Sequence, residues 1–136
     1  MPLAMAIYHF SAKVISRAKG SSAVASAAYR SASRLFDEKL NRHHDFSNKA
    51  GVIHSEVMLP QGSPERLNDR TVLWNEVEAG EKRKDAQLAR EVEFSIPREM
   101  NEKQGVALAR DFVKKQFVAS YPMFAWMVHQ QRISMA

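Results

Sequence analysis

The sequence contains no cysteine, which excludes a disulfide framework and any metal site that uses thiolate ligands. A bound metal ion would therefore need carboxylate or imidazole ligands, and the chain has five histidines. The sequence also lacks an apolar run approaching the roughly 18 to 20 residues that cross a bilayer, and no signal peptide opens it. We therefore expect a soluble, cytoplasmic protein with no membrane insertion.

A single domain accounts for the length of 136 residues, of which 45% are hydrophobic. We assign residues 5–136 to this domain and regard residues 1–4 as an upstream start or a vector remnant. The sequence shows no internal repeat and no low-complexity run. Twenty lysines and arginines against fifteen aspartates and glutamates give a net charge of +5, which fits a polyanionic partner without requiring one.

Apolar periodicity and turn residues predict that strands and helices alternate along the chain. Strands are expected at residues 5–15, 52–59, 90–96 and 123–129. Helices are expected from Ser21 or Ser22 to about Phe36, from Pro64 to about Gly80, and after a cap at Asn101. Residues 36–51 are polar and have no sustained period, so we expect an exposed loop or irregular arm there, and residues 81–85 should be solvated. Such alternation usually indicates a parallel sheet.

Tyr29 lies one position off the apolar stripe of the first expected helix, which is rich in alanine and serine. One interpretation is an ordinary boundary tyrosine with a hydrated hydroxyl group. The other is a nucleophile. A phenol, with an ordinary pKa of roughly 10, then needs a nearby positive charge or a metal-bound phosphate in order to react.

Histidines and carboxylates on the expected strands are candidate ligands. His9 and His129 each lie on a strand, where an imidazole is either a hydrogen-bonded structural group or a metal ligand. Glu91 and Glu93 must share one face of their alternating strand. That face is either solvated or turned toward a metal ion or a ligating histidine.

Basic residues precede the first expected helix and also lie within it. Arg17 and Lys19 precede its N-terminus, where free N–H groups would suit a phosphate, and Arg30 and Arg34 follow Tyr29. Surface loops also carry such residues routinely. We treat all four as candidate DNA-binding residues.

Four sequence blocks together resemble the MobA/MobL (MobQ-type) plasmid mobilisation relaxases. They are Ala6–Lys13, Ser22–Ser31, Val52–Pro60 and Arg83–Pro97, in this order. The resemblance implies an α+β fold of the HUH-endonuclease (relaxase) type, with a central, largely antiparallel sheet flanked by helices. In that fold three histidines hold a metal ion and a neighbouring helix carries the nucleophilic tyrosine. This implication replaces the parallel-sheet expectation.

The resemblance also assigns roles to individual residues. It implies that Tyr29 attacks the phosphate at the nick site and that His129 is the first metal ligand. Glu91 or Glu93, of which we prefer Glu91, would orient a ligand or help to hold a divalent ion, Mg²⁺ or Mn²⁺. The family's following His-x-His strand has no counterpart before Ala136. We therefore expect a fold that is incomplete at its C-terminus, weak metal binding and little nicking by this chain alone.

The implied function is that of a DNA relaxase domain in plasmid conjugation or mobilisation. Such a domain binds single-stranded DNA at the transfer origin and nicks it by transesterification, leaving a 5′-phosphotyrosyl adduct, with auxiliary mobilisation and coupling proteins as further partners. The alternative is a catalytically inactive DNA-binding remnant that uses the basic residues without cutting. A third interpretation, a small soluble domain with incidental charge, predicts oligonucleotide binding that is absent or insensitive to salt.

Overall fold

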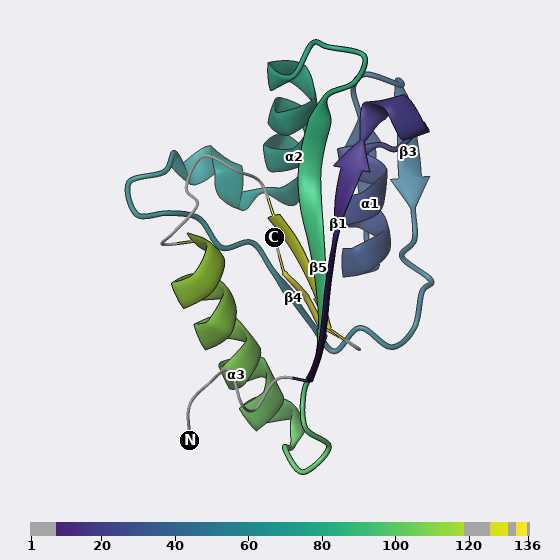
Figure 1. Cartoon of the computed structure of the whole chain (residues 1–136). Coiled ribbons are helices and arrows are strands. Elements are labelled where there is room, and N and C mark those ends of the chain that lie inside the picture. The colour runs from purple at the N-terminus through teal and green to yellow at the C-terminus, as the bar shows by residue number, and fades with distance from the viewer. Residues whose placement is uncertain (1–7, 119–125, 131–132, 136) are drawn as a thin grey trace.

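The computed structural model describes residues 8–118, 126–130 and 133–135, which form a central sheet with helices on both faces (Figure 1). The regular elements follow one another as β1 (Tyr8–Ser16), α1 (Ala23–Ser31), β2 (Arg34–Asp37), β3 (Arg42–Asp45), β4 (His54–Glu56), α2 (Arg70–Gly80), β5 (Gln87–Ser95), α3 (Glu102–Val113), β6 (Trp126–Gln130) and β7 (Ile133–Met135). Short 3₁₀ turns cover Arg17–Lys19 and Glu65–Asn68, and a π-helical turn covers Lys114–Val118.

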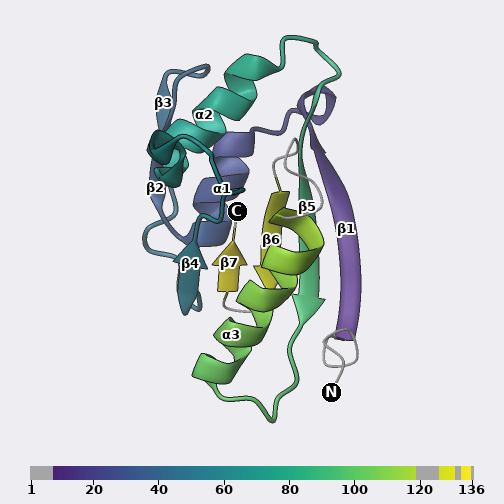
Figure 2. The same ribbon diagram turned by 90° about the vertical axis from the view of Figure 1, so that its left-hand side faces the viewer.

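The main sheet has the strand order β1-β5-β6-β7-β4, which can be followed across Figure 2. β1 pairs antiparallel with β5 in the longest ladder, and β6 pairs antiparallel with β7. β5 and β6 are parallel, as are β4 and β7. The α+β architecture is therefore confirmed, whereas the parallel sheet suggested by alternation alone is wrong for the β1–β5 and β6–β7 pairs.

Strand β5 separates two hydrophobic cores because its successive side chains point to opposite faces. Val92 and Phe94 pack with Ala109 and Val113 of α3 on one face. Ala89 packs with α1 on the other face, in a cluster that also includes Trp74 of α2. Figure 1 shows α3 on one side of the sheet and α1, with the β2–β3 hairpin beyond it, on the other. The candidate site lies on the α1 side.

The first helix is shorter than the sequence predicted. α1 ends at Ser31, because Ala32 adopts a left-handed conformation with φ of 53° and ψ of 49°. The chain then forms the antiparallel β2–β3 hairpin in place of the expected irregular arm. Two of its buried residues are polar, Asp37 and His44, so this hairpin has no apolar alternation to detect.

Other helix and strand boundaries differ from those predicted from the sequence, for local reasons. α2 begins at Arg70 rather than Pro64, because the side chain of Asp69 accepts hydrogen bonds from the N–H groups of Thr71 and Val72. The expected strand over residues 52–59 contains only β4, and β7 was not expected. The Asn101 cap of α3 is confirmed, and Gln104 completes a capping box.

Residues 81–85 are exposed, as predicted. Within the described ranges, no helix combines the length and apolar character needed to cross a bilayer.

Candidate active site around Tyr29

The N-terminus of α1 is held by groups from the protein itself. Ser22 caps the helix, with its Oγ accepting a hydrogen bond from the N–H of Ala25 at 3.1 Å. The N–H of Ala23 donates to Oε1 of Glu78, a buried residue of α2, at 2.7 Å. A carboxylate at a helix N-terminus is a favourable arrangement. Two of the N–H groups at this end, those of Ala23 and Ala25, are therefore already engaged by Glu78 and Ser22 and are not free for a phosphate.

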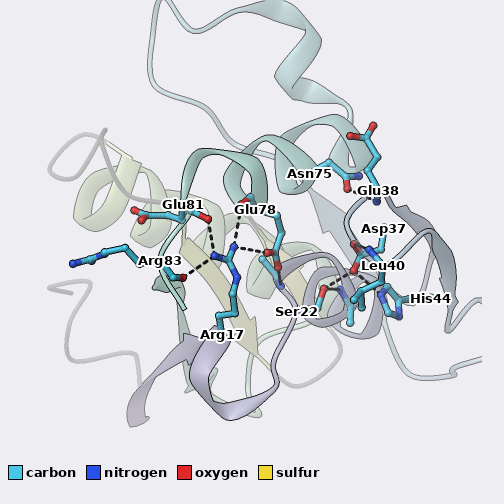
Figure 3. A network of polar contacts seen from close by, with 12 residues as sticks. Arg17, Ser22, Asp37, Glu38, Leu40, His44, Asn75, Glu78, Glu81 and Arg83 are labelled. Atoms are coloured by element: carbon cyan, nitrogen blue, oxygen red, sulfur yellow. Dashed lines mark hydrogen bonds and ion pairs between the residues drawn. The ribbon is translucent and has the colours of Figure 1, made fainter. Parts of the chain in front are cut away.

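Hydrogen bonds from Arg17 connect the turn after β1 to the end of α2 (Figure 3). Its guanidinium donates to the carbonyl oxygens of Glu78, Glu81 and Arg83 and to Oε2 of Glu78, over distances of 2.6 to 3.0 Å. A phosphate contact from Arg17 would have to compete with these four bonds. Lys19, in the same turn, is exposed.

Tyr29 lies near the C-terminal end of α1 with 43% of its surface exposed. Its ring meets Phe46 edge to face at a centroid distance of 5.3 Å. Two cations also lie against the ring: the Nζ of Lys49 is 3.7 Å from the centroid, and the guanidinium carbon of Arg30 is 5.2 Å away. Two positive charges therefore lie against the ring of Tyr29.

Lys49 contacts Tyr29 at two points. Besides lying over the ring, its ammonium group donates a hydrogen bond of 2.9 Å to the carbonyl oxygen of Tyr29. Burial lowers the pKa of Lys49 and the charge of Arg30 adds to this shift, while the carboxylate of Glu91 opposes it. Lys49 was not predicted as a site residue, because it lies in the segment expected to be irregular and no local pattern marks it.

Glu91 is buried, with 5% of its surface exposed, and it carries a cationic partner on either side. One is Arg30, which forms a close ion pair with it. The other is Lys13, its partner in the β1–β5 register, with Nζ 3.9 Å from Oε1. Glu93 is exposed two residues further along the same face of β5. Of the pair, Glu91 thus contacts the residue next to Tyr29.

A cleft of about 380 Å³ opens beside these residues. Its lining includes Tyr29, Arg30, Lys13 and Glu91 together with two residues of β3, Arg42 and His44. Arg34 lies on the same hairpin, exposed, with its Nε 3.8 Å from Asp45. Basic side chains around one carboxylate give the cleft the character of an anion-binding surface.

A buried network joins the hairpin to the cap of α1 (Figure 3). The carboxylate of Asp37, 1% exposed, accepts from the Oγ of Ser22 at 2.8 Å, lies 2.9 Å from Nε2 of His44, and accepts from the N–H of Leu40 at 3.1 Å. Burial raises the pKa of Asp37, but the hydrogen bonds from His44, Ser22 and Leu40 outweigh it and hold the pKa below its ordinary value. The helix that carries Tyr29 is thereby fixed to one wall of the cleft.

The described residues do not assemble a metal site. No group of three His, Asp or Glu side chains suited to a metal ion occurs among residues 10–116, whose side chains the structure describes. The cations beside Glu91 would also compete with a metal ion for its carboxylate. The backbone of His129 is in register with Glu93 across the β5–β6 pair, but the side chains of His9 and His129 lie outside what the structure describes.

Comparisons with known proteins agree on one family. A model of the MobA/MobL family matches residues 21–134. The chain is 41% identical to the conjugal transfer protein TraA of Rhizobium radiobacter over 136 aligned positions, covering 93% of this chain and 12% of that protein. It is 48% identical to the mobilization protein MobL of Acidithiobacillus ferridurans over 110 positions, covering 81% of this chain and 28% of that protein.

One solved structure, described as the molecular basis of vancomycin resistance transfer in Staphylococcus aureus, has a similar fold. A chain of that structure superposes with a TM-score of 0.76 at 41% identity, covering 81% of this chain and 56% of the other. The sequence thus spans roughly an eighth of the TraA relative and just over a quarter of the MobL relative, at 12% and 28% of their lengths.

Proposed function

The chain belongs to the MobA/MobL family, and from this premise we propose that it is a relaxase domain that binds single-stranded DNA at a plasmid transfer origin and nicks it with Tyr29. One observation carries the proposal. Tyr29 is exposed at a basic cleft with Lys49 and Arg30 against its ring. The site of action would be the bacterial cytoplasm, with auxiliary mobilisation and coupling proteins as partners.

The proposed reaction exchanges one phosphate ester for another. The phenolic oxygen of Tyr29 attacks the phosphorus of a DNA phosphodiester, and the bond to the 3′ oxygen breaks. The tyrosine proton is lost, the 3′ oxygen leaves as a hydroxyl group, and the 5′ end remains joined to Tyr29. Because one ester replaces another, no external oxidant, reductant or nucleotide is needed, and reversal of the step reseals the strand.

The charges around the cleft suit this substrate. Lys13 and Arg42 line the cleft with exposed side chains, and they are well placed for phosphates that flank the scissile one. Arg30, with its side chain 17% exposed and paired to Glu91, would face the reacting phosphate. Lys19 and Arg34, both exposed, extend the basic surface beyond the cleft.

A catalytically inactive DNA-binding domain is the second candidate, and the surroundings of Glu91 favour it. This carboxylate is engaged by Arg30 and Lys13, and no three-ligand metal group occurs among the described residues. Binding without cutting is the outcome that this candidate predicts.

Adduct formation separates the two candidates. The chain would be incubated with single-stranded oligonucleotides spanning candidate transfer origins, in Mn²⁺ and in EDTA, and resolved on a denaturing gel. We expect a covalent adduct that Tyr29→Phe abolishes and that mass spectrometry places on Tyr29. Tyr8→Phe, which removes another of the three tyrosines, is the matched control and should leave the adduct intact.

Two other outcomes would each decide a specific point, the activity of the domain or the identity of the nucleophile. Tight binding without an adduct in either buffer would favour the inactive domain. An adduct that persists in Tyr29→Phe would contradict the assignment of the nucleophile, whatever its yield.

A further inference from the structure

We infer that Lys49 is a positioning residue, which holds the ring of Tyr29 in a fixed orientation at the mouth of the cleft. The inference rests on the proposed function in one respect, namely that Tyr29 is the nucleophile. It assigns to the site a residue that lies neither on α1 nor on the central sheet.

A tight turn after β3 brings Lys49 to the tyrosine. Asp45 ends β3, and its Oδ1 accepts hydrogen bonds from the N–H and the Oγ of Ser47 at 2.9 and 2.5 Å. The N–H of Lys49 then donates to the carbonyl oxygen of Phe46 at 2.9 Å. This turn places Phe46 in a T-shaped contact with the Tyr29 ring and Lys49 over the face of that ring.

The hairpin behind this turn is itself anchored to α1. The N–H of Phe46 donates to the carbonyl oxygen of Ser33 at 3.0 Å, and Ser33 follows directly on the left-handed end of the helix. The turn and the helix end therefore form one connected unit. Movement of Lys49 relative to Tyr29 would have to break bonds within it.

The two contacts of Lys49 restrict two different motions of Tyr29. The hydrogen bond to the Tyr29 carbonyl oxygen, at 2.9 Å, fixes the backbone at a helix C-terminus, where a cation is favoured. The ammonium group 3.7 Å from the ring centroid restrains the ring itself through a cation–π contact. Arg30 cannot replace Lys49 in both of these contacts, because the guanidinium group of Arg30 is ion-paired with Glu91.

Orientation matters for an in-line attack on phosphorus. A displacement of about 1 Å in the position of a reacting group can lower a rate by roughly a hundredfold. An exposed tyrosine near the end of a nine-residue helix has few other restraints. Lys49 and Phe46 supply them from outside the helix.

The test compares Lys49→Met with Lys49→Arg, and uses Lys84→Met, an exposed lysine between α2 and β5, as the matched control. At saturating oligonucleotide, we expect Lys49→Met to slow adduct formation by about tenfold to a hundredfold while changing oligonucleotide affinity less than about twofold. Lys49→Arg keeps a cation and should recover part of the rate. Lys84→Met should behave as the unaltered chain.

A second measurement does not depend on cutting. With ¹³C-labelled tyrosine rings, the Tyr29 resonance is identified by its loss in Tyr29→Phe, and NMR follows it in each lysine variant. We expect Lys49→Met to shift this resonance and to broaden or average it, while Lys84→Met leaves it unchanged. The same spectra show whether each variant is folded.

The possible outcomes distinguish failure of the Lys49 inference from failure of the nicking proposal. An unaltered rate together with an unaltered ring resonance in Lys49→Met overturns the inference and leaves the nicking proposal intact. Weaker oligonucleotide binding with a normal saturated rate also overturns it, because Lys49 would then be a DNA contact. If the unaltered chain forms no adduct at all, the nicking proposal fails, and the ring resonance alone decides whether Lys49 holds Tyr29.

Discussion

Asp37 illustrates how one buried charge can organise a site at the scale of a single residue. It is 1% exposed, yet the groups around it donate hydrogen bonds to both of its oxygens. A buried carboxylate is costly unless it is satisfied in this way. Its donors come from the cap of α1, the hairpin turn and β3, so the carboxylate links the nucleophile's helix to the cleft wall.

Asp37→Asn should lower the free energy of unfolding by about 2 kcal/mol at neutral pH, because hydrogen bonds to a charged acceptor are lost. The pKa of Asp37 in the folded chain lies below its ordinary value of 3.8, so its stabilisation is complete above about pH 3.8 and is lost as the pH falls through the lower, folded-state pKa. The difference between the two proteins, measured by urea unfolding, should therefore shrink below that pH.

Asp85→Asn, an exposed carboxylate in the α2–β5 loop, is the control for this prediction. It should change stability far less at any pH. A stability difference for Asp37→Asn that stays constant from pH 7 into the acid range would contradict the assignment of the charge to Asp37.

The residues of the candidate site were only partly predictable. Tyr29 and Glu91 were singled out through the family resemblance, because periodicity fixes only the face that a side chain occupies and left a boundary role for Tyr29 open. Lys49 could not, because its contact with Tyr29 depends on a turn 20 residues away in sequence. Arg17 was selected for its charge, but its charge is used to bind carbonyl oxygens at the end of α2.

At the scale of the element, the end of α1 matters most, because Tyr29 lies two residues before the last helical residue, Ser31. Ala32 has φ of 53°, and its N–H donates to the carbonyl oxygens of Ala28 and Tyr29. An alanine in the left-handed region costs about 1 to 2 kcal/mol, whereas glycine adopts it freely. Neither glycine nor asparagine marks this position, so the end of the helix could not be predicted from a C-terminal signal.

Ala32→Gly should raise the free energy of unfolding by about 0.5 to 1 kcal/mol, because relief of the strained backbone exceeds the extra entropy of the unfolded chain. Thermal unfolding followed by circular dichroism measures the change. Ala25→Gly, within the right-handed part of α1, is the matched control and should destabilise by about 1 kcal/mol. Equal losses in both variants would argue against the left-handed conformation of Ala32.

Elements with strong local signals were predicted better than those without them. The Asn101 cap and the strand β5 were confirmed, because capping and pleating act within a few residues. The β2–β3 hairpin was not predicted, since Asp37 and His44 satisfy each other in the interior where apolar residues were sought. β4 has only three residues, too few for a period.

For the whole molecule, the distribution of charge matters more than its sum. A net charge of +5 is modest, but Lys13, Arg30 and Arg42 converge on the cleft beside Tyr29. Phosphate contacts release counterions, so the affinity for single-stranded DNA should fall as salt rises. An affinity that does not change with salt concentration would instead support the interpretation that the positive charge is incidental.

Arg42→Gln should weaken oligonucleotide binding at low salt to a similar degree for different sequences. It should also reduce the slope of log affinity against log salt by about 0.7, the value for one lost phosphate contact on a single strand. Fluorescence anisotropy over a salt series measures both. Lys84→Gln removes a charge away from the cleft and should leave the slope unchanged; a similar drop in slope there would indicate a diffuse field rather than a cleft contact.

Sheet order was the least predictable property of the whole molecule. Alternating strands and helices suggested parallel pairing, and local patterns contain no information about which strands become neighbours. The family resemblance supplied the α+β arrangement. The mixed pairing follows from β6, which joins β5 in parallel and turns back into β7.

The central place of β6 has a consequence for biosynthesis. When a ribosome has released everything up to α3, β5 still presents one uncovered edge, and β4, whose described partner is β7, is unpaired. Such an edge is a template for pairing with other chains. The nascent polypeptide therefore remains vulnerable to aggregation until β6 emerges to cover the edge of β5 and β7 emerges to pair with β4. Protection by a holding chaperone would matter most in that interval.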